Sequence, residues 1–177
     1  MPLPKRKRLD KDTPANYRTI SNLNTISKNI EKFVFGRLRR HWTSSPSFNR
    51  AQTAYRRHNS SETALLRTTD AAYRAADRSE AALIVAFDIS AAFDTVNHFS
   101  LLSHLHNSFS VGGNALPWIS SYLSERSQTV HVGSASSTPP RCSCGVPQGS
   151  ILGPILFTVC TSPVADVADS DHVNRQQ

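Results

Sequence analysis

The sequence predicts an α+β fold with a helical, basic first half and a mixed second half. Apolar residues recur at helical spacing in two stretches of the first 80 residues. Seven apolar residues then run from Ala81 to Phe87 without a charge, which is typical of a buried strand. Residues 128–133 alternate in polarity like a strand, and further helical stretches surround them. A helical first half followed by a second half that mixes strands with helices favours the α+β class.

Length and composition predict a soluble, intracellular protein. A chain of 177 residues fits one domain, or one and a fraction, and its mean hydropathy is −0.36. No apolar run approaches the roughly 20 residues that span a bilayer. The basic N-terminus has no apolar segment after it, so secretion is not expected. The three cysteines have no Cys-x-x-Cys spacing, which argues against a disulfide framework or a zinc site and favours the nucleus or the cytoplasm.

Charge is distributed unevenly along the chain. Residues 1–80 hold 17 Lys and Arg against 7 Asp and Glu, a net +10, whereas residues 81–177 hold 3 against 6, a net −3. Clustered cations bind phosphates through counterion release, so nucleic acid is one interpretation and a merely solubilising basic face is the other. The run Pro-Lys-Arg-Lys-Arg at 4–8 fits a nuclear-import signal or a phosphate contact equally.

The first half is predicted to contain two helices. Residues 21–42 carry apolar side chains at helical spacing with Lys and Arg on other faces, which predicts an amphipathic helix with a basic side. Residues 43–49 include a proline and several hydroxyl side chains, as loops do. A second helix is predicted over 59–77, where Asn59 would cap the helix and Glu62 would return the contact.

The predicted strand over 83–88 ends in a carboxylate, Asp88. An ionised aspartate at the edge of a core is costly unless it is paired, hydrogen-bonded or bound to a cation. Two interpretations remain open from these residues alone: Asp88 binds a metal at the lip of a sheet, or it caps the following turn.

The second half alternates helical and strand-like stretches. Gly112 and Gly113 separate two of the predicted helices, and Pro117 is tolerated because it sits early in the second one. The predicted elements are a helix at 98–109, a helix at 115–123, a hairpin with strands at 128–133 and 141–145 around a turn at 134–140, and an apolar helix at 151–167.

A glycine-rich loop, Gly145-Val-Pro-Gln-Gly-Ser150, precedes the last of these helices. Glycines let a backbone approach a ligand closely, and a helix N-terminus offers free amide donors to phosphate or sugar. By itself this signal resembles an ordinary turn.

Five stretches taken together, in order, resemble the reverse transcriptases, most closely those of non-LTR retrotransposons. They span roughly residues 5–167. The matching stretches are Asn16-Tyr-Arg-Thr-Ile-Ser-Asn-Leu23 with Lys28 and Arg37-Leu38; Gln52-x-x-Tyr55-Arg56 with Ser61-x-x-Ala64; Phe87-Asp-Ile-Ser-Ala-Ala-Phe-Asp94; Trp118-x-x-Ser121-Tyr-Leu with Arg126; and Gly145-Val-Pro-Gln-Gly-Ser-x-Leu-Gly-Pro-x-Leu-Phe157.

The resemblance implies a polymerase with helical fingers at 1–80 and part of a palm, an incomplete antiparallel sheet with flanking helices, at 81–167. It also implies an RNA template, a DNA primer, deoxynucleoside triphosphates and two Mg²⁺ ions. The implied roles are Asp88 as first catalytic aspartate and metal ligand, Ile89 as a backbone metal ligand, Phe93 as the gate under the sugar, Arg18 as the triphosphate contact, Gln148 and Gly149 as the nucleotide loop, Asp94 as a helix cap, and Lys5, Lys7 and Arg56 as nucleic-acid contacts.

The chain also departs from the family pattern. Thr19 stands where the family ordinarily has proline, and no Tyr-x-Asp-Asp occurs in the 177 residues. Asp166, Asp169 and Asp171 lack an apolar strand that would hold them at a site, so 168–177 is predicted to be a disordered polar tail.

Three hypotheses follow from this pattern. The chain is a truncated polymerase without turnover of its own, a non-catalytic nucleic-acid-binding remnant, or part of a longer active polymerase. In the 177 residues alone, the 83–88 strand would lack the partner strands that the missing motif supplies, which would leave apolar surface unpaired.

Overall fold

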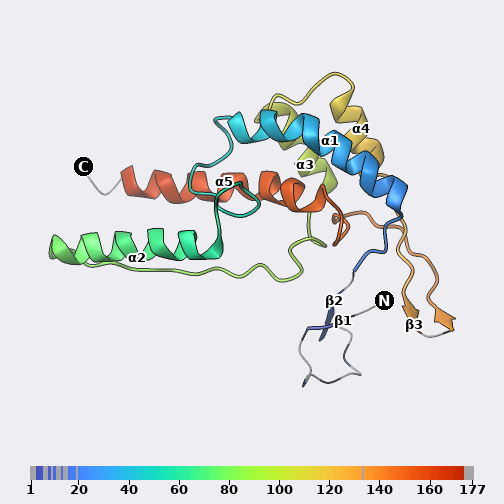
Figure 1. The fold of residues 1–177 in the computed structure, drawn as a ribbon, viewed down its shortest axis with the longest axis horizontal. Helices are drawn as coiled ribbons and strands as arrows, with labels where there is room; N and C mark the ends of the chain where they lie inside the picture. Colours follow the sequence, from blue (N-terminus) through green and yellow to red (C-terminus); the bar gives the residue numbers. More distant parts are fainter. Residues whose placement is uncertain are drawn as a thin grey trace.

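The structure of the chain is a computed structural model that describes residues 3–5, 8, 10, 13, 16–18, 20–132 and 134–173. The described part contains five α-helices and four strands of two residues each (Figure 1). The helices are α1 (Thr25–Ser44), α2 (Ser61–Asp77), α3 (His98–Asn107), α4 (Ala115–Leu123) and α5 (Gly153–Val173), and the strands are β1 (Leu3–Pro4), β2 (Tyr17–Arg18), β3 (His131–Val132) and β4 (Ala135–Ser136).

All five predicted helices are confirmed; α4 has the predicted bounds, and the other four are shifted at one or both ends. Asn24 caps α1 by accepting a hydrogen bond from the backbone N–H of Ser27. The predicted cap of α2 is wrong by one residue, because Ser60 and Thr63 form the reciprocal capping box there. The last helix, α5, continues to Val173, past residue 168 where the sequence predicts a disordered tail.

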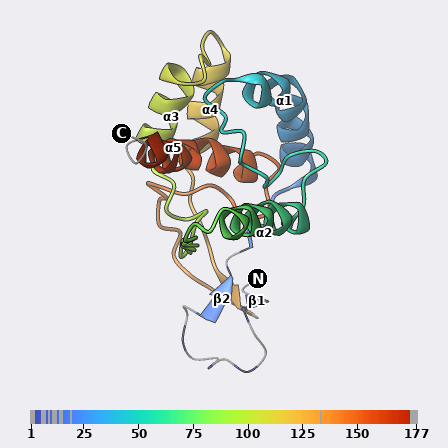
Figure 2. The same ribbon diagram turned by 90° about the vertical axis from the view of Figure 1, so that its left-hand side faces the viewer.

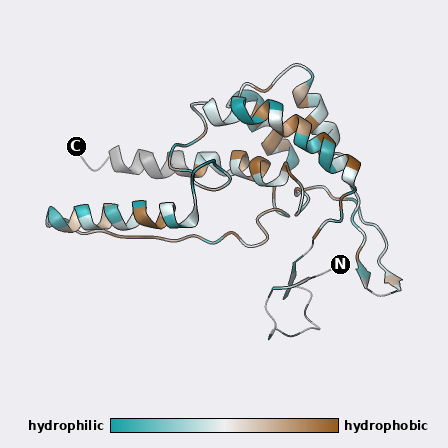
Figure 3. Cartoon of the chain, in the orientation of Figure 1, coloured by the Kyte–Doolittle hydropathy of each residue, from teal (hydrophilic) through white to brown (hydrophobic). Residues whose placement is uncertain are grey.

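One hydrophobic core joins the end of α1 to α3, α4 and α5. Figure 2 shows these four helices gathered together, and Figure 3 shows hydrophobic residues concentrated in the first turns of α5. No residue of α2 is buried, and α2 lies apart from the other helices in both views. The buried hydrophobic residues are Trp42, Phe48, Val96, Leu101, Leu105, Phe109, Val111, Ile119, Leu123, Val146, Leu152, Ile155, Leu156 and Val159.

The predicted buried strand at 83–88 is wrong. Residues 81–89 have no strand partner and no regular secondary structure, and they run alongside α2 in Figure 1. Leu83 and Phe87 are each 88% exposed. A strand is stable only when its backbone groups pair with a neighbour. The unpaired apolar surface that the sequence predicted here is present, but the strand is not.

The incomplete antiparallel sheet is also not formed in the described part of the chain. The only ladders there are β1 with β2 and β3 with β4, both antiparallel. The predicted hairpin exists but is shorter, since β3 pairs with β4 rather than with 141–145. An isolated bridge between Ser127 and Arg141 extends it. Among the described residues, no helix has the length and apolar character to cross a membrane.

Two valines that differ in exposure should differ in how much the same substitution changes the free energy of unfolding. Val85 is 59% exposed and Val96 is 3% exposed. Val85→Thr should change the free energy of unfolding by less than about 0.5 kcal/mol. Val96→Thr buries a hydroxyl group and should lower it by roughly 1–3 kcal/mol. Urea denaturation of the two variants measures both values, and equal losses would mean that Val85 is buried.

Candidate nucleotide site

The glycine-rich loop at 145–150 is held against the turn that follows Asp88. Gly145 N–H donates to the carbonyl of Val96 and Val146 N–H donates to that of Phe93, each at 2.7 Å. Nε2 of His98 lies 2.7 Å from the carbonyl oxygen of Gly145, which a protonated Nε2 satisfies as donor. The loop and the turn therefore form one unit, although about 50 residues separate them.

A third segment, 20–23, completes this arrangement from the N-terminal side. Ser21 N–H donates to the carbonyl of Gln148 at 2.9 Å. The neighbouring Gly149 has φ +100°, which few other residues adopt, and a Cβ there would lie 3.5 Å from the carbonyl oxygen of Ser21. Residues 20–23 and the turn at 90–96 therefore meet at the loop, although all three segments are far apart in the sequence.

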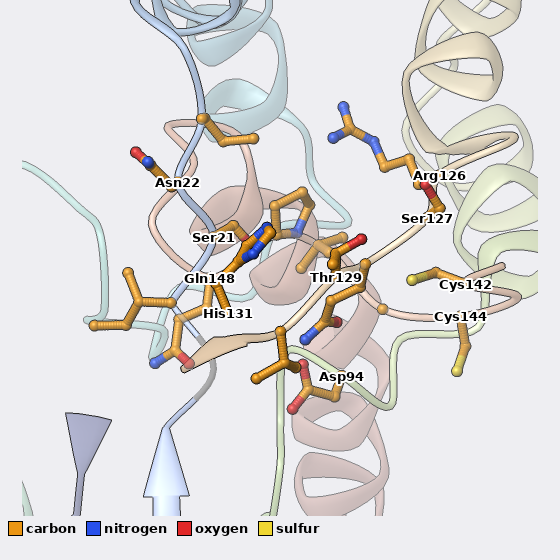
Figure 4. A pocket seen from close by; sticks show the side chains of 17 residues that line it. Ser21, Asn22, Asp94, Arg126, Ser127, Thr129, His131, Cys142, Cys144 and Gln148 are labelled. Carbon is orange, nitrogen blue, oxygen red and sulfur yellow. The ribbon is translucent and has the colours of Figure 1, made fainter. Parts of the chain in front are cut away.

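These segments, together with residues 126–131, surround an open cavity of about 530 Å³, shown in Figure 4. This volume is within the range of small-molecule sites. Ser21, Asp94, Arg126 and Gln148 contribute polar side chains to its lining, so it carries both charge signs and an amide. Such a lining can hydrogen-bond to the polar groups of a nucleotide.

The resemblance implies four nucleotide-binding residues. Gln148 lines this cavity, whereas Arg18, Phe93 and Gly149 do not. Phe93 is half-buried, and its ring packs on that of Phe157 with centroids 5.5 Å apart. Arg18 is exposed on β2, three residues before Ser21. The structure thus places Phe93, Gln148 and Gly149 on one unit and Arg18 close to it in sequence.

Asp88 and Ile89 lie on the exposed segment and do not line the cavity. Among the described residues, no group of three or more His, Cys, Asp or Glu side chains is placed to hold a metal ion. The described residues therefore do not by themselves form the two-metal site that the resemblance implies, and no chemical step through a metal can be derived from them.

Asp94 does not cap a helix. The cap of α3 is Asn97, whose side chain accepts from the backbone N–H of Ser100 at 2.9 Å. Asp94 lies in the turn before it, is exposed, and lines the cavity instead. The predicted cap is therefore wrong: aspartate is a good capping residue, but the helix begins after Asn97 and not after Asp94.

The implied nucleic-acid contacts differ in their surroundings. Lys5 is exposed directly after β1, and Lys7 lies outside the described residues. Arg56 is half-buried, with its guanidinium 5.8 Å from the ring centroid of Phe48 and a hydrogen bond to the carbonyl of Arg50. Its donors are therefore partly engaged within the chain.

The backbone amides of residues 151–153, which lead into the first turn of α5, are hydrogen-bonded within the chain, whereas the sequence predicted free donors there. The carboxylate of Glu31, from α1, accepts from the N–H groups of Ile151 at 2.7 Å and Leu152 at 3.3 Å. Ser150 Oγ accepts from the N–H of Gly153 at 2.8 Å. An internal anion therefore occupies the position where the sequence predicted a phosphate or sugar.

Tyr122 on α4 also contacts this carboxylate. Its hydroxyl donates to Oε1 of Glu31 at 3.2 Å. Burial raises the pKa of Tyr122 to about 12, so the hydroxyl remains a donor at neutral pH. Neither Glu31 nor Tyr122 was assigned a role from the sequence.

The ordered motifs that meet at the loop–turn unit resemble those of template-directed nucleic-acid polymerases. Comparison with known families agrees: residues 3–174 match the family described as reverse transcriptase (RNA-dependent DNA polymerase), and the chain belongs to it. The resemblance to non-LTR retrotransposon enzymes is confirmed by individual relatives as well.

Three relatives illustrate the similarity. The chain is 33% identical over 151 residues to the probable RNA-directed DNA polymerase from transposon BS of Drosophila melanogaster, covering 85% of this chain and 16% of that protein. It is 30% identical over 162 residues to the RNA-directed DNA polymerase from mobile element jockey of the same species, covering 88% and 18%. It is 29% identical over 151 residues to the Pol polyprotein of the type-1 retrotransposable element R2 of Popillia japonica, covering 84% and 20%. The chain thus spans no more than a fifth of these relatives.

Proposed function

We propose that this chain forms the fingers and the first part of the palm of an RNA-directed DNA polymerase. The observation that carries the proposal is the loop–turn unit: the glycine-rich loop at 145–150 is hydrogen-bonded to the turn that follows the Asp88 segment. In this arrangement the nucleotide lies between the loop and the N-terminal segment. Template RNA and primer DNA follow the basic first half, whose net charge is +10.

The proposed roles follow the resemblance. Asp88 is the first catalytic aspartate, and it would bind Mg²⁺ together with the carbonyl of Ile89 once further carboxylates are present. Phe93 is the sugar gate, Gln148 and Gly149 form the nucleotide loop, and Arg18 contacts the triphosphate. The exposed segment 81–89 would become a palm strand when it pairs with strands outside these 177 residues.

The 177-residue polypeptide alone is expected not to extend a primer. Two-metal catalysis needs carboxylates on both sides of the ion pair, and this chain supplies one from the matched motifs. Primer extension on an RNA template with Mg²⁺ and deoxynucleoside triphosphates measures this directly. Incorporation by the purified chain that disappears in Asp88→Ala would contradict the expectation.

A chimaera with a relative tests whether Asp88 acts as the catalytic aspartate. The chain is joined to the segment that follows the matched region in the transposon BS protein. We expect Mg²⁺-dependent incorporation that falls by at least about 10³-fold in Asp88→Ala, with Asp70→Ala, on exposed α2, as the matched control. A chimaera that folds and binds primer–template but incorporates nothing would refute the assignment of Asp88.

A second candidate is nucleic-acid binding without catalysis. It is favoured by the exposed cations of α1, where the guanidinium of Arg37 lies 4.6 Å from the ring centroid of Phe33. Binding of RNA and DNA by the chain should weaken steeply with salt, with a slope proportional to the number of phosphates contacted. Tight, salt-dependent binding together with an inactive chimaera would favour this candidate over the polymerase.

A further inference from the structure

One charged side chain is buried among the described residues, and it is Glu31, which is 1% exposed. A buried carboxylate is destabilising unless hydrogen bonds compensate its lost hydration. Glu31 receives three such bonds: from the backbone of Ile151, the backbone of Leu152 and the hydroxyl of Tyr122. Its charge also lies at the positive end of α5, where a helix favours anions. The site is therefore built around an anion that the chain itself provides.

This carboxylate fixes one end of the glycine-rich loop. Ile151 follows the loop directly, so hydrogen bonds to Ile151 and Leu152 set where the loop ends and α5 begins. The other end, at Gly145, is already fixed by its bonds to Val96 and His98. Ser21, ten residues before Glu31, holds the carbonyl of Gln148 between these two ends.

Glu31 is also connected to the cavity through Tyr122 and Arg126. Arg126 lines the cavity, its guanidinium lies 4.3 Å from the ring centroid of Tyr122, and its Nε donates to the carbonyl of Tyr122. Tyr122 in turn donates to Glu31. The position of a cavity side chain and that of the loop are thus tied to the same buried carboxylate.

We propose that Glu31 is a positioning residue for the nucleotide loop, holding Gln148 and Gly149 in place by accepting hydrogen bonds from the backbone amides of Ile151 and Leu152, the two residues between the loop and α5. The proposal rests on the proposed function. Because Glu31 occupies those amides, the polyphosphate of a nucleotide cannot use them. The phosphates must then be bound by cations such as Arg18, and the loop contacts the rest of the nucleotide.

The test compares the whole chain with Glu31→Ala, Glu31→Gln and the control Glu62→Gln, which changes an exposed carboxylate on α2. Amide resonances and hydrogen exchange are recorded by NMR. In Glu31→Ala, exchange at Ile151 and Leu152 should rise at least about tenfold, and the resonances of Gln148 and Gly149 should move. Glu31→Gln keeps one acceptor oxygen and should show the same changes at smaller size, whereas Glu62→Gln should show none.

Chemical rescue adds a readout that a general loss of stability would not produce. A hollow of about 220 Å³ borders Glu31, Ile30 and Tyr122, so formate can reach the space that Glu31→Ala leaves. Formate should return the exchange rates at 151–152 and the resonances of Gln148 and Gly149 towards those of the original chain. Rescue at 151–152 without rescue at Gln148 and Gly149 would overturn the proposal.

Nucleotide affinity separates this proposal from the proposed function. Deoxynucleoside triphosphate should bind Glu31→Ala about tenfold more weakly than the original chain, and Glu62→Gln equally well. If the original chain binds no nucleotide, the proposed function loses support, while the resonances of Gln148 and Gly149 still decide the role of Glu31. Should Glu31→Ala fail to fold, Glu31→Gln decides: unchanged resonances of Gln148 and Gly149 in that variant refute positioning.

Discussion

Replacing Gly145 with alanine is expected to lower the free energy of unfolding by roughly 2–4 kcal/mol. Gly145 has φ +91°, a left-handed conformation in which a Cβ is strained. That Cβ would also lie 3.1 Å from both the Cα and the carbonyl oxygen of Asp94 and 3.2 Å from the carbonyl oxygen of Phe93. All three are backbone atoms, so no side chain can rotate away to make room. The loop must separate from the turn, and its hydrogen bonds to Phe93 and Val96 weaken as it does.

Gly36→Ala is the matched control for this substitution. Gly36 lies inside α1, and a Cβ there would meet nothing within 4 Å. Alanine should therefore stabilise the helix by about 0.5–1 kcal/mol. Urea denaturation of both variants gives the two values, and amide exchange at Gly145 and Val146 reports whether the loop has opened. A neutral Gly145→Ala would mean that the loop does not lie against the turn.

The helices were predictable because their signals are local. The spacing of Leu101 and Leu105 in α3 predicts a helix with one buried face, and both residues are buried there. The same holds for α4, whose bounds agree with the prediction. Periodicity within one segment needs no information about its neighbours.

Whether residues 81–89 form a strand could not be predicted in the same way. An apolar run shows that a segment favours pairing, but the ladder forms only if a partner strand is present. The described residues offer none, and Leu83 and Phe87 stay exposed. The same composition that predicts a core strand therefore gives an exposed segment here.

The role of Glu31 was missed for a different reason. The apolar residues Ile26, Ile30 and Phe33 suggest the buried face of α1, yet all three are exposed. The buried face instead runs through Glu31, Leu38 and Trp42, which recur at helical spacing. A glutamate in such a row could have indicated a buried acceptor, but only once the amides of Ile151 and Leu152 were known to face it.

Leu101→Ala is expected to lower the free energy of unfolding by about 2–5 kcal/mol. Leu101 is fully buried in α3, which packs against both α4 and α5. The substitution leaves a cavity where these helices meet, and close-packed neighbours relax into it only partly. Because α5 begins shortly after the glycine-rich loop, loss of this packing should also make the loop less well positioned.

Leu65→Ala in α2 makes the same chemical change on a helix outside the core. Leu65 is 66% exposed, so the free energy of unfolding should change by no more than about 0.5 kcal/mol. Urea denaturation of the two variants compares them directly. If Leu101→Ala loses much free energy of unfolding and Leu65→Ala loses none, the stable core consists of α1, α3, α4 and α5, and α2 contributes little to it. Equal losses would mean that α2 packs on that core in solution.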